Sequence, residues 1–144
     1  MIFLSYNLEE KRKIIMDHYL KPVNKKENIN FQFEEFGISC SDHLEYKYKI
    51  ENNKIVEIIF NGQGCAFFIA ATDILCSLIK NKTIDEAIEL INCYELFING
   101  KELKNEELKK MGELQIFDNV KQHYNRLNCA LMLANSLREK LKNE

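Results

Sequence analysis

The spacing of apolar residues changes along this chain, and that change limits its fold more than any other feature. Residues 43–50 alternate apolar and polar side chains, which is typical of a strand with one buried face. The apolar members are Leu44, Tyr46, Tyr48 and Ile50. Similar stretches precede it in "INFQFEEFG" and follow the turn signal "ENN" in "KIVEIIFNG". Three strands with short connections predict an antiparallel meander with one face buried.

After Gly64 the apolar residues recur at the spacing of a helix. A second helix is predicted from Thr83 to about Ile91, because "TIDE" places Glu86 three residues after Thr83, as in a capping box. The final helix is predicted to begin near Cys129. The residues expected to point inward on it are Ala130, either Leu133 or Ala134, Leu137 and Leu141.

A helix is also predicted before the strands, in "NLEEKRKIIMDHYL", with Asn7 capping its first turn and Pro22 following its last. Its predicted buried face consists of Leu8, Ile14, Ile15 and Tyr19. Residues 99–114 are charged and irregular, apart from a short helix around "NEELKKM". Strands followed by helices indicate an α+β fold, in which a three-stranded antiparallel sheet packs against several helices. We expect a single domain spanning residues 1–144.

Composition excludes some classes of function. The net charge of −2 offers no electrostatic argument for binding nucleic acid or an anionic membrane. The apolar start of "MIFLSYNLEEKRK" is too short for a signal peptide, and no apolar run is long enough to span a bilayer. We therefore expect a cytoplasmic protein without a membrane partner. Its five cysteines are then core residues, metal ligands or reactive thiols rather than a disulfide framework.

Two of the cysteines lie beside polar or flexible residues that suit a ligand. Cys40 and Asp42 are two apart in "ISCSDH", so in an extended segment both side chains point to the same side. Cys65 follows Gly62 and Gly64 at the predicted start of a helix. The free N–H groups and the dipole at that end favour a thiolate.

Cys129 is expected at the start of another helix, with the cation of Arg126 three residues before it. Cys76 lies roughly 16 Å along the helix from Cys65 at 1.5 Å per residue, too far to share one metal ion. We therefore predict that Cys76 is a core residue, and that Cys93 is structural as well.

Together Cys40, Asp42, Cys65 and Cys129 would supply three sulfur atoms and one oxygen to a tetrahedral site. Zinc accepts cysteine and aspartate ligands, and thiolates also hold iron–sulfur clusters. Scattered single cysteines do not form a motif of paired ligands. Spacing alone therefore leaves open whether these residues are ligands or core residues.

Several short motifs occur in an order that matches a known family over nearly the whole chain. "IIMDHYLKPVN" resembles the family's opening segment, and "SCSD" stands where the family has Cys-Gly-Asp. "FNGQGCA" resembles its second cysteine motif, "KNKTIDEA" its link to the next helix, and "RLNCALMLA" its third cysteine motif. The chain thus resembles the SufU branch of the NifU/IscU iron–sulfur cluster assembly family. The branch is indicated by Asn128, where IscU-type scaffolds carry histidine, and by a longer segment around residues 94–114.

The resemblance implies zinc bound by Cys40, Asp42, Cys65 and Cys129. It also implies that the chain receives sulfur from a SufS-like cysteine desulfurase, which makes it a possible zinc-dependent sulfurtransferase. In this interpretation Cys40 lies on a mobile loop and is the catalytic acceptor of persulfide sulfur, while the other ligands hold the metal. Arg126 has the second catalytic role, which is to stabilise the developing thiolate.

Two other interpretations remain. The chain could be a scaffold that assembles a [2Fe–2S] cluster on Cys40, Cys65 and Cys129, with Asp42 as a labile ligand, and passes it to acceptor proteins. Alternatively, zinc could be purely structural in an adaptor protein, which predicts a closed site that never releases a ligand.

Some residues depart from the family pattern. Ser41 replaces the glycine of Cys-Gly-Asp, Gln63 replaces an acidic residue and Lys21 replaces an asparagine. Asn128 lacks the basicity of a ligand, and "AFFIAATD" lacks the serines typical of the family. These changes leave the ligands intact but put contacts with partners in doubt.

The histidines are predicted to have lesser roles. His18 is expected to pack against the sheet or cap it, and His123 is expected on the surface. His43 is expected at a surface strand position, with a role beside Asp42 as the alternative.

Overall fold

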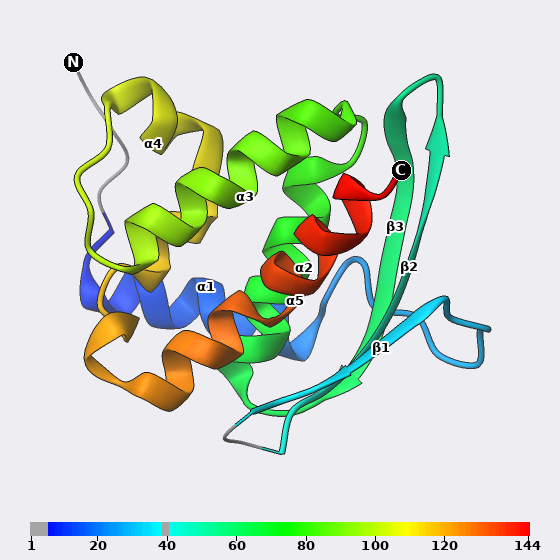
Figure 1. Ribbon diagram of the computed structural model, residues 1–144. Helices are drawn as coiled ribbons and strands as arrows, with labels where there is room; N and C mark the ends of the chain where they lie inside the picture. Colours follow the sequence, from blue (N-terminus) through cyan, green and yellow to red (C-terminus); the bar gives the residue numbers. More distant parts are fainter. Residues whose placement is uncertain (1–5, 39–40) are drawn as a thin grey trace.

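The computed structural model describes residues 6–38 and 41–144. Its strands form one antiparallel sheet in the order β1-β2-β3, and the helices cover one face of that sheet (Figure 1). The elements are α1 (Leu8–Leu20), β1 (Phe33–Phe36), β2 (His43–Glu51), β3 (Lys54–Gln63), α2 (Ala66–Ile79), α3 (Ile84–Ile98), α4 (Asn105–Met111), the 3₁₀ helices η1 (Gly112–Phe117) and η2 (Val120–Gln122), and α5 (Tyr124–Lys142). The predicted α+β fold is confirmed.

The sheet follows the alternation of the sequence. On β2, Leu44 and Tyr46 are fully buried toward the helices, whereas the residues between them lie at the other face. The "ENN" turn joins β2 to β3 with Asn52 and Asn53 at φ of 52° and 65°. Asparagine tolerates this left-handed conformation, which the tightest hairpin turns require. The predicted meander is therefore confirmed.

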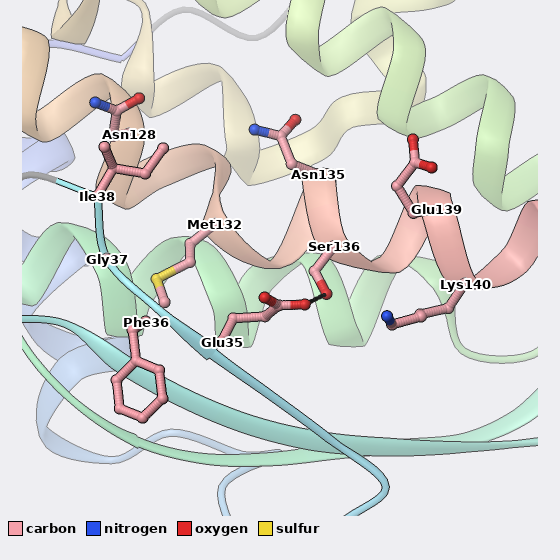
Figure 2. Close-up of a pocket in the computed structure, with 10 residues that line it drawn as sticks. All are labelled: Glu35, Phe36, Gly37, Ile38, Asn128, Met132, Asn135, Ser136, Glu139 and Lys140. Carbon is pink, nitrogen blue, oxygen red and sulfur yellow. Dashed lines mark hydrogen bonds between the residues drawn. The ribbon is translucent and has the colours of Figure 1, made fainter.

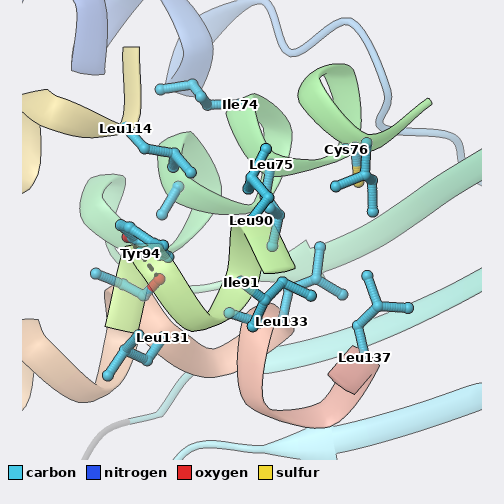
Figure 3. Close-up of a cluster of buried hydrophobic side chains, with 14 of the residues drawn as sticks. Ile74, Leu75, Cys76, Leu90, Ile91, Tyr94, Leu114, Leu131, Leu133 and Leu137 are labelled. Atoms are coloured by element: carbon cyan, nitrogen blue, oxygen red, sulfur yellow. Dashed lines mark hydrogen bonds between the residues drawn. The ribbon is translucent and has the colours of Figure 1, made fainter. Parts of the chain in front are cut away.

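Helix α2 forms the centre of the helical layer. It is buried along nearly its whole length, and it packs against α1, α5 and β3. A helix that is apolar on all sides has no face suited to water, so it is enclosed by the other elements. Figure 3 shows Ile74, Leu75 and Cys76 of α2 within the buried cluster. Burial raises the pKa of the Cys76 thiol, and its predicted core position is confirmed.

The predicted cap at Asn7 and the predicted capping box at Thr83 are confirmed, and Asn7 forms a capping box as well. The Asn7 side chain accepts a hydrogen bond from the Glu10 N–H, and the Glu10 carboxylate accepts one from the Asn7 N–H. Thr83 and Glu86 make the same reciprocal pair at the start of α3. Each box satisfies N–H groups that the first helical turn leaves unpaired.

Two helices differ from their predicted extent or packing. Helix α3 continues to Ile98 instead of ending near Ile91, because Tyr94 and Ile98 extend its buried stripe. In α1, Ile15 is buried, but Leu8 and Tyr19 are exposed. Their predicted burial was wrong because α1 packs mainly against α2 and leaves most of its surface in solvent.

Helix α5 begins at Tyr124, not near Cys129 as predicted. Its first turn is polar and exposed, so the apolar spacing does not reveal where the helix starts. Cys129 is therefore in the second turn, where it is 4% exposed and gains little from the helix terminus. The residues predicted to point inward on this helix are buried as expected.

The segment before α5 contains more structure than its charge suggests. The predicted short helix is α4, and η1 and η2 follow it without any clear sequence signal. Leu114 and Phe117 of η1 are fully buried, so this segment contributes to the core. Among the described residues, no helix has the length and apolarity needed to cross a membrane.

Candidate metal centre

Asp42, Cys65 and Cys129 come together in space although they are distant in sequence. One ligand atom from each, a carboxylate oxygen and two Sγ atoms, lies within 4.8 Å of the others. Asp42 precedes β2, Cys65 precedes α2, and Cys129 lies in α5. Cys40, the other predicted ligand, lies outside the described residues.

Asp42 is held at the base of the connection between β1 and β2. Its main-chain oxygen accepts a hydrogen bond of 2.8 Å from the Gly37 N–H. The residue is 3% exposed, and its Oδ1 accepts a hydrogen bond of 3.0 Å from the Cys65 N–H. The carboxylate thus connects the sheet to the start of α2.

The other oxygen of the same carboxylate, Asp42 Oδ2, is buried and has no hydrogen-bond partner among the described residues. A buried polar atom without a partner costs free energy, and a carboxylate oxygen costs more than a neutral one. A cation at this position would compensate that cost. The unpaired oxygen and its sulfur neighbours therefore fit a metal site.

Two glycines allow this close approach. A Cβ atom on Gly64 would lie 2.1 Å from Asp42 Oδ1, and one on Gly62 would lie 2.6 Å from the His43 main-chain oxygen. Side chains at these positions would displace the carboxylate or the strand. The "GQG" sequence before Cys65 is thus required by the packing around Asp42.

Cys65 occupies the N-cap position of α2 with an extended backbone, and its side chain makes no capping hydrogen bond. This cysteine is exposed, whereas Cys129 is buried. The unpaired N–H groups of the first helical turn favour an anionic sulfur at this end. A set of thiolates and a carboxylate suits zinc, and the same thiolates suit an iron–sulfur cluster.

Arg126, predicted to be catalytic, lies in the first turn of α5, one turn before Cys129. Its guanidinium carbon is 4.8 Å from the centroid of the Phe67 ring, which is a favourable cation–π distance. The centroid of the Phe67 ring in turn lies 6.3 Å from the centroid of the Phe117 ring in η1. The aromatic pair thus supports the Arg126 side chain, and its catalytic role stays a prediction.

His43 points away from the metal centre. Its Nε2 lies 2.6 Å from Glu34 Oε2, and its ring stacks on Phe36 at 4.7 Å between centroids. The predicted surface position is confirmed. His43 does not belong to the cluster of ligand atoms found among the described residues.

His18 connects three elements of the helical layer. Its Nδ1 lies 2.7 Å from Asp73 Oδ2 on α2, and its Nε2 lies 2.9 Å from Glu113 Oε1 on η1. The hydrogen bond to Asp73 raises the pKa of His18, and Glu113 adds to this effect although burial opposes it. His18 therefore connects helices, and its predicted position against the sheet was wrong.

The sequence did not predict the role of Asp73 or the burial of Asn128. Asp73 is 0% exposed in the middle of α2, and the signal for it is a single carboxylate within the apolar run "AATDILC". Asn128 precedes Cys129, and its Nδ2 atom is buried with no hydrogen-bond partner in the described part of the chain. Nothing in the sequence shows that this amide is buried.

Cys93 is buried near Glu107, as its predicted structural role requires.

Comparison with known sequences identifies the family. A family model for the NifU-like N terminal domain matches residues 10–130. The chain belongs to this family. It is 25% identical over 122 residues to the zinc-dependent sulfurtransferase SufU of Bacillus subtilis (strain 168), covering 84% of this chain and 82% of that relative. It is 27% identical over 130 residues to the iron–sulfur cluster assembly scaffold protein IscU of Streptococcus pyogenes serotype M1, covering 90% and 80%.

Solved structures agree with this assignment. A putative iron–sulfur cluster assembly scaffold protein for the SUF system from Fervidobacterium islandicum AW-1 superposes with a TM-score of 0.76 at 31% identity. The alignment covers 90% of this chain and 94% of that one. A hypothetical protein at 22% identity has the same fold, with a TM-score of 0.81 over 92% and 96% of the two chains. The predicted IscU/NifU-like fold and the resemblance to SufU are confirmed.

Proposed function

We propose that this chain is an iron–sulfur cluster assembly protein that binds zinc and accepts persulfide sulfur from a cysteine desulfurase. The observation that carries this proposal is the state of Asp42. This buried carboxylate uses one oxygen to hold the Cys65 main chain, and its other oxygen is unpaired among the described residues. One of the two oxygens lies within 4.8 Å of the sulfur atoms of Cys65 and Cys129. A buried carboxylate with an unpaired oxygen destabilises the fold unless a cation binds beside it.

The names of the similar proteins support two parts of this proposal, the role in iron–sulfur cluster assembly and the transfer of sulfur. Assembly of iron–sulfur clusters is common to the names of the IscU relatives and of the Fervidobacterium protein. The SufU relative is named as a zinc-dependent sulfurtransferase. Asn128 supports the SufU-like alternative, because its amide is a poor metal ligand where IscU-type scaffolds carry histidine.

In this proposal Asp42, Cys65 and Cys129 hold zinc, and Cys40 completes the set of ligands. Bound zinc keeps the coordinating thiols deprotonated at neutral pH. The protein contributes a fixed carboxylate, because the Cys65 N–H holds Oδ1 and the absence of a side chain at Gly64 leaves room for it.

The proposed transfer uses Cys40 as the nucleophile. Its thiolate attacks the outer sulfur of the desulfurase persulfide and forms a new sulfur–sulfur bond. The bond between that outer sulfur and the desulfurase cysteine breaks, and the electron pair leaves on the desulfurase cysteine. Arg126, supported by Phe67, provides a positive charge that stabilises the thiolates. The persulfide now on Cys40 is the form in which the chain carries sulfur to later acceptors.

The first experiment is to purify the chain without added metal, measure its zinc and iron content and absorbance, and assay desulfurase turnover. We expect one zinc ion per chain, a colourless sample and faster turnover on addition of the wild type. Cys40→Ala should abolish the stimulation, and Asp42→Ala should lower the zinc content. Cys93→Ala is the matched control, since this buried thiol lies beside Glu107, and it should behave as the wild type. Equal stimulation by Cys40→Ala would contradict the proposal.

A second candidate is a scaffold that assembles a [2Fe–2S] cluster and transfers it to acceptor proteins. The same thiols and the oxygen of Asp42 suit that cargo, and the IscU relatives are named as scaffolds. This function predicts a brown protein that contains iron and sulfide. It also predicts that Asp42→Ala retains the cluster longer, because the carboxylate is the labile ligand.

A further inference from the structure

A groove of about 350 Å³ lies between β1 and α5 (Figure 2). Its lining includes Gly37, whose N–H donates to the Asp42 main-chain oxygen, and Asn128, which precedes Cys129. Residues 35–38 form one wall. The other wall consists of Asn128, Met132, Asn135, Ser136, Glu139 and Lys140. These positions on α5 span roughly 18 Å at 1.5 Å per residue. The groove is therefore elongated, and Asn128 at one end directly precedes Cys129 in the sequence.

The strand that lines this groove is the uncovered edge of the sheet. At the opposite edge, residues on β3 pair with other parts of the chain: the Lys26 N–H donates to the Phe60 oxygen and the Asn81 N–H to the Ile55 oxygen. Among the described residues, no segment pairs with the outer side of β1. The groove therefore has main-chain groups along one side that are open to a partner.

The register shows which main-chain groups of β1 point outward. The Gly37 N–H donates to the Asp42 oxygen, so Gly37 faces β2. Main-chain groups of an antiparallel strand alternate between its two sides, so Glu35 also faces β2, while Glu34 and Phe36 face outward. Such an edge is complementary to another extended chain.

Asn128 provides an independent sign of a ligand. Its Nδ2 atom is buried and unpaired within the described ranges, and Figure 2 shows the side chain at the end of the groove near Ile38. A buried N–H without an acceptor costs free energy, so an acceptor supplied by a ligand would stabilise it. A main-chain carbonyl of a bound peptide is such an acceptor.

The lining changes in polarity along the groove. At the end that contains Asn128 it includes Ile38 and Met132, and Ile38 is 83% exposed. At the far end it includes Glu139 and Lys140, and the Lys140 ammonium lies 5.2 Å from the Phe33 ring. The groove thus suits a peptide that is apolar at the Asn128 end and polar at the Lys140 end.

We infer that this groove binds an extended peptide segment of the cysteine desulfurase, whose main chain pairs with the β1 edge and whose carbonyl group accepts a hydrogen bond from Asn128. The inference rests on the proposed function, which supplies the partner. About five extended residues would fill the groove at 3.3 Å per residue. A segment bound in this way would be guided toward the metal centre, where sulfur is transferred.

Two identical substitutions test the groove. Asn135 and Asn92 are both exposed helix residues, and both accept hydrogen bonds from Arg138, but Asn135 lines the groove and Asn92 does not. Asn135→Trp should raise the chain concentration that half-saturates desulfurase stimulation by about tenfold, the size of one important interface contact. The maximal rate should change much less. Asn92→Trp should stay within about twofold of the wild type, as expected for a surface position outside an interface.

Hydrogen exchange provides a second readout that does not depend on sulfur transfer. On addition of the desulfurase to the full chain, the amide hydrogens of Glu34 and Phe36 should exchange more slowly. The same protection is expected in Asn92→Trp, and it should be lost in Asn135→Trp. Thermal unfolding and zinc content of both variants should match the wild type, which shows that the fold and the metal centre are preserved.

Several outcomes would overturn the inference. Equal half-saturation by the two tryptophan variants, or unchanged exchange at Glu34 and Phe36, excludes the groove as the docking site. A wild-type dimer that Asn135→Trp dissociates would assign the groove to a second copy of the chain. If the wild type fails to stimulate the desulfurase, the proposed function fails. Protection of Glu34 and Phe36 by the desulfurase would in that case still support the groove.

Discussion

Asp42 and Asp73 are both buried aspartates, but their carboxylates differ in the hydrogen bonds that they accept. Asp73 is 0% exposed, and both of its oxygens are hydrogen bonded. Its donors are His18 Nδ1, the Val23 and Asn24 N–H groups, and Asn24 Nδ2. Asp42 is almost as deeply buried, yet its carboxylate accepts a hydrogen bond from the Cys65 N–H at Oδ1 while Oδ2 has no partner in the described part of the chain.

This difference indicates that the Asp73 carboxylate has a structural role and that the Asp42 carboxylate is available to a ligand. The charge of Asp73 is compensated entirely within the protein, and its hydrogen bonds join α1 and the segment after it to α2. The charge of Asp42 is compensated only in part, so its site becomes favourable when a cation binds. Burial alone would not have distinguished the two residues.

The same substitution at both positions gives the largest expected effect. Asp73→Asn places an amide N–H against N–H donors, and we expect a loss of about 3 kcal/mol in the free energy of unfolding. Asp42→Asn keeps an oxygen for the Cys65 N–H, so the metal-free chain should change by less than about 1 kcal/mol. Urea unfolding of chelator-treated protein measures both. Similar losses in the two variants would contradict the comparison.

A methyl group beside Asp42 should have the next largest effect. Gly64→Ala forces the carboxylate to move, since the new Cβ would lie 2.1 Å from Oδ1. We expect a loss of about 2 kcal/mol together with much weaker zinc binding. Gly100→Ala is the control, because the atoms nearest to its added Cβ belong to the flexible Lys121 side chain and the residue lies at a φ of 85°. It should cost about 1 kcal/mol and leave zinc binding unchanged. Zinc titration and thermal unfolding distinguish the two.

The hydrogen bond between His18 and Asp73 also predicts that the free energy of unfolding depends on pH. The pKa of His18 is raised in the folded chain, chiefly by its hydrogen bond to Asp73. Its stabilising contribution is therefore complete below the unfolded pKa of about 6.5 and is lost as pH rises through the raised folded pKa. In the wild type, the free energy of unfolding should therefore decrease as the pH rises from about 6, and His18→Gln should remove this decrease. Urea unfolding over this pH range measures it. His123→Gln, at an exposed position, should retain it.

The smallest expected effect on stability is at Cys65. This residue occupies the N-cap of α2 without a capping hydrogen bond, and serine is a much better N-cap. In the metal-free chain, Cys65→Ser should stabilise the fold by up to about 0.5 kcal/mol while zinc binding falls sharply. Urea unfolding with and without zinc tests this. A clear loss of stability in the metal-free variant would show that Cys65 has a structural role.

The amino-acid sequence predicted those parts of the fold that depend on neighbouring residues. Alternation of apolar residues in β2, the cap at Asn7 and the capping box at Thr83 are local patterns, and all were found in the structure. The start of α5 was missed because its first turn is polar and exposed. The burial of Leu8 was wrong for a related reason, since amphipathic spacing does not reveal how much of a helix another element covers.

By itself, then, the sequence determined the order and type of most elements and the residues that could be ligands, because spacing and residue chemistry act locally. Only the tertiary structure decided that Asp42, Cys65 and Cys129 meet and that, among the described residues, one oxygen of Asp42 stays unpaired. The same is true of the groove beside Asn128. Burial and hydrogen-bond satisfaction depend on which distant segments pack together, and that is set by the whole core rather than by any local pattern.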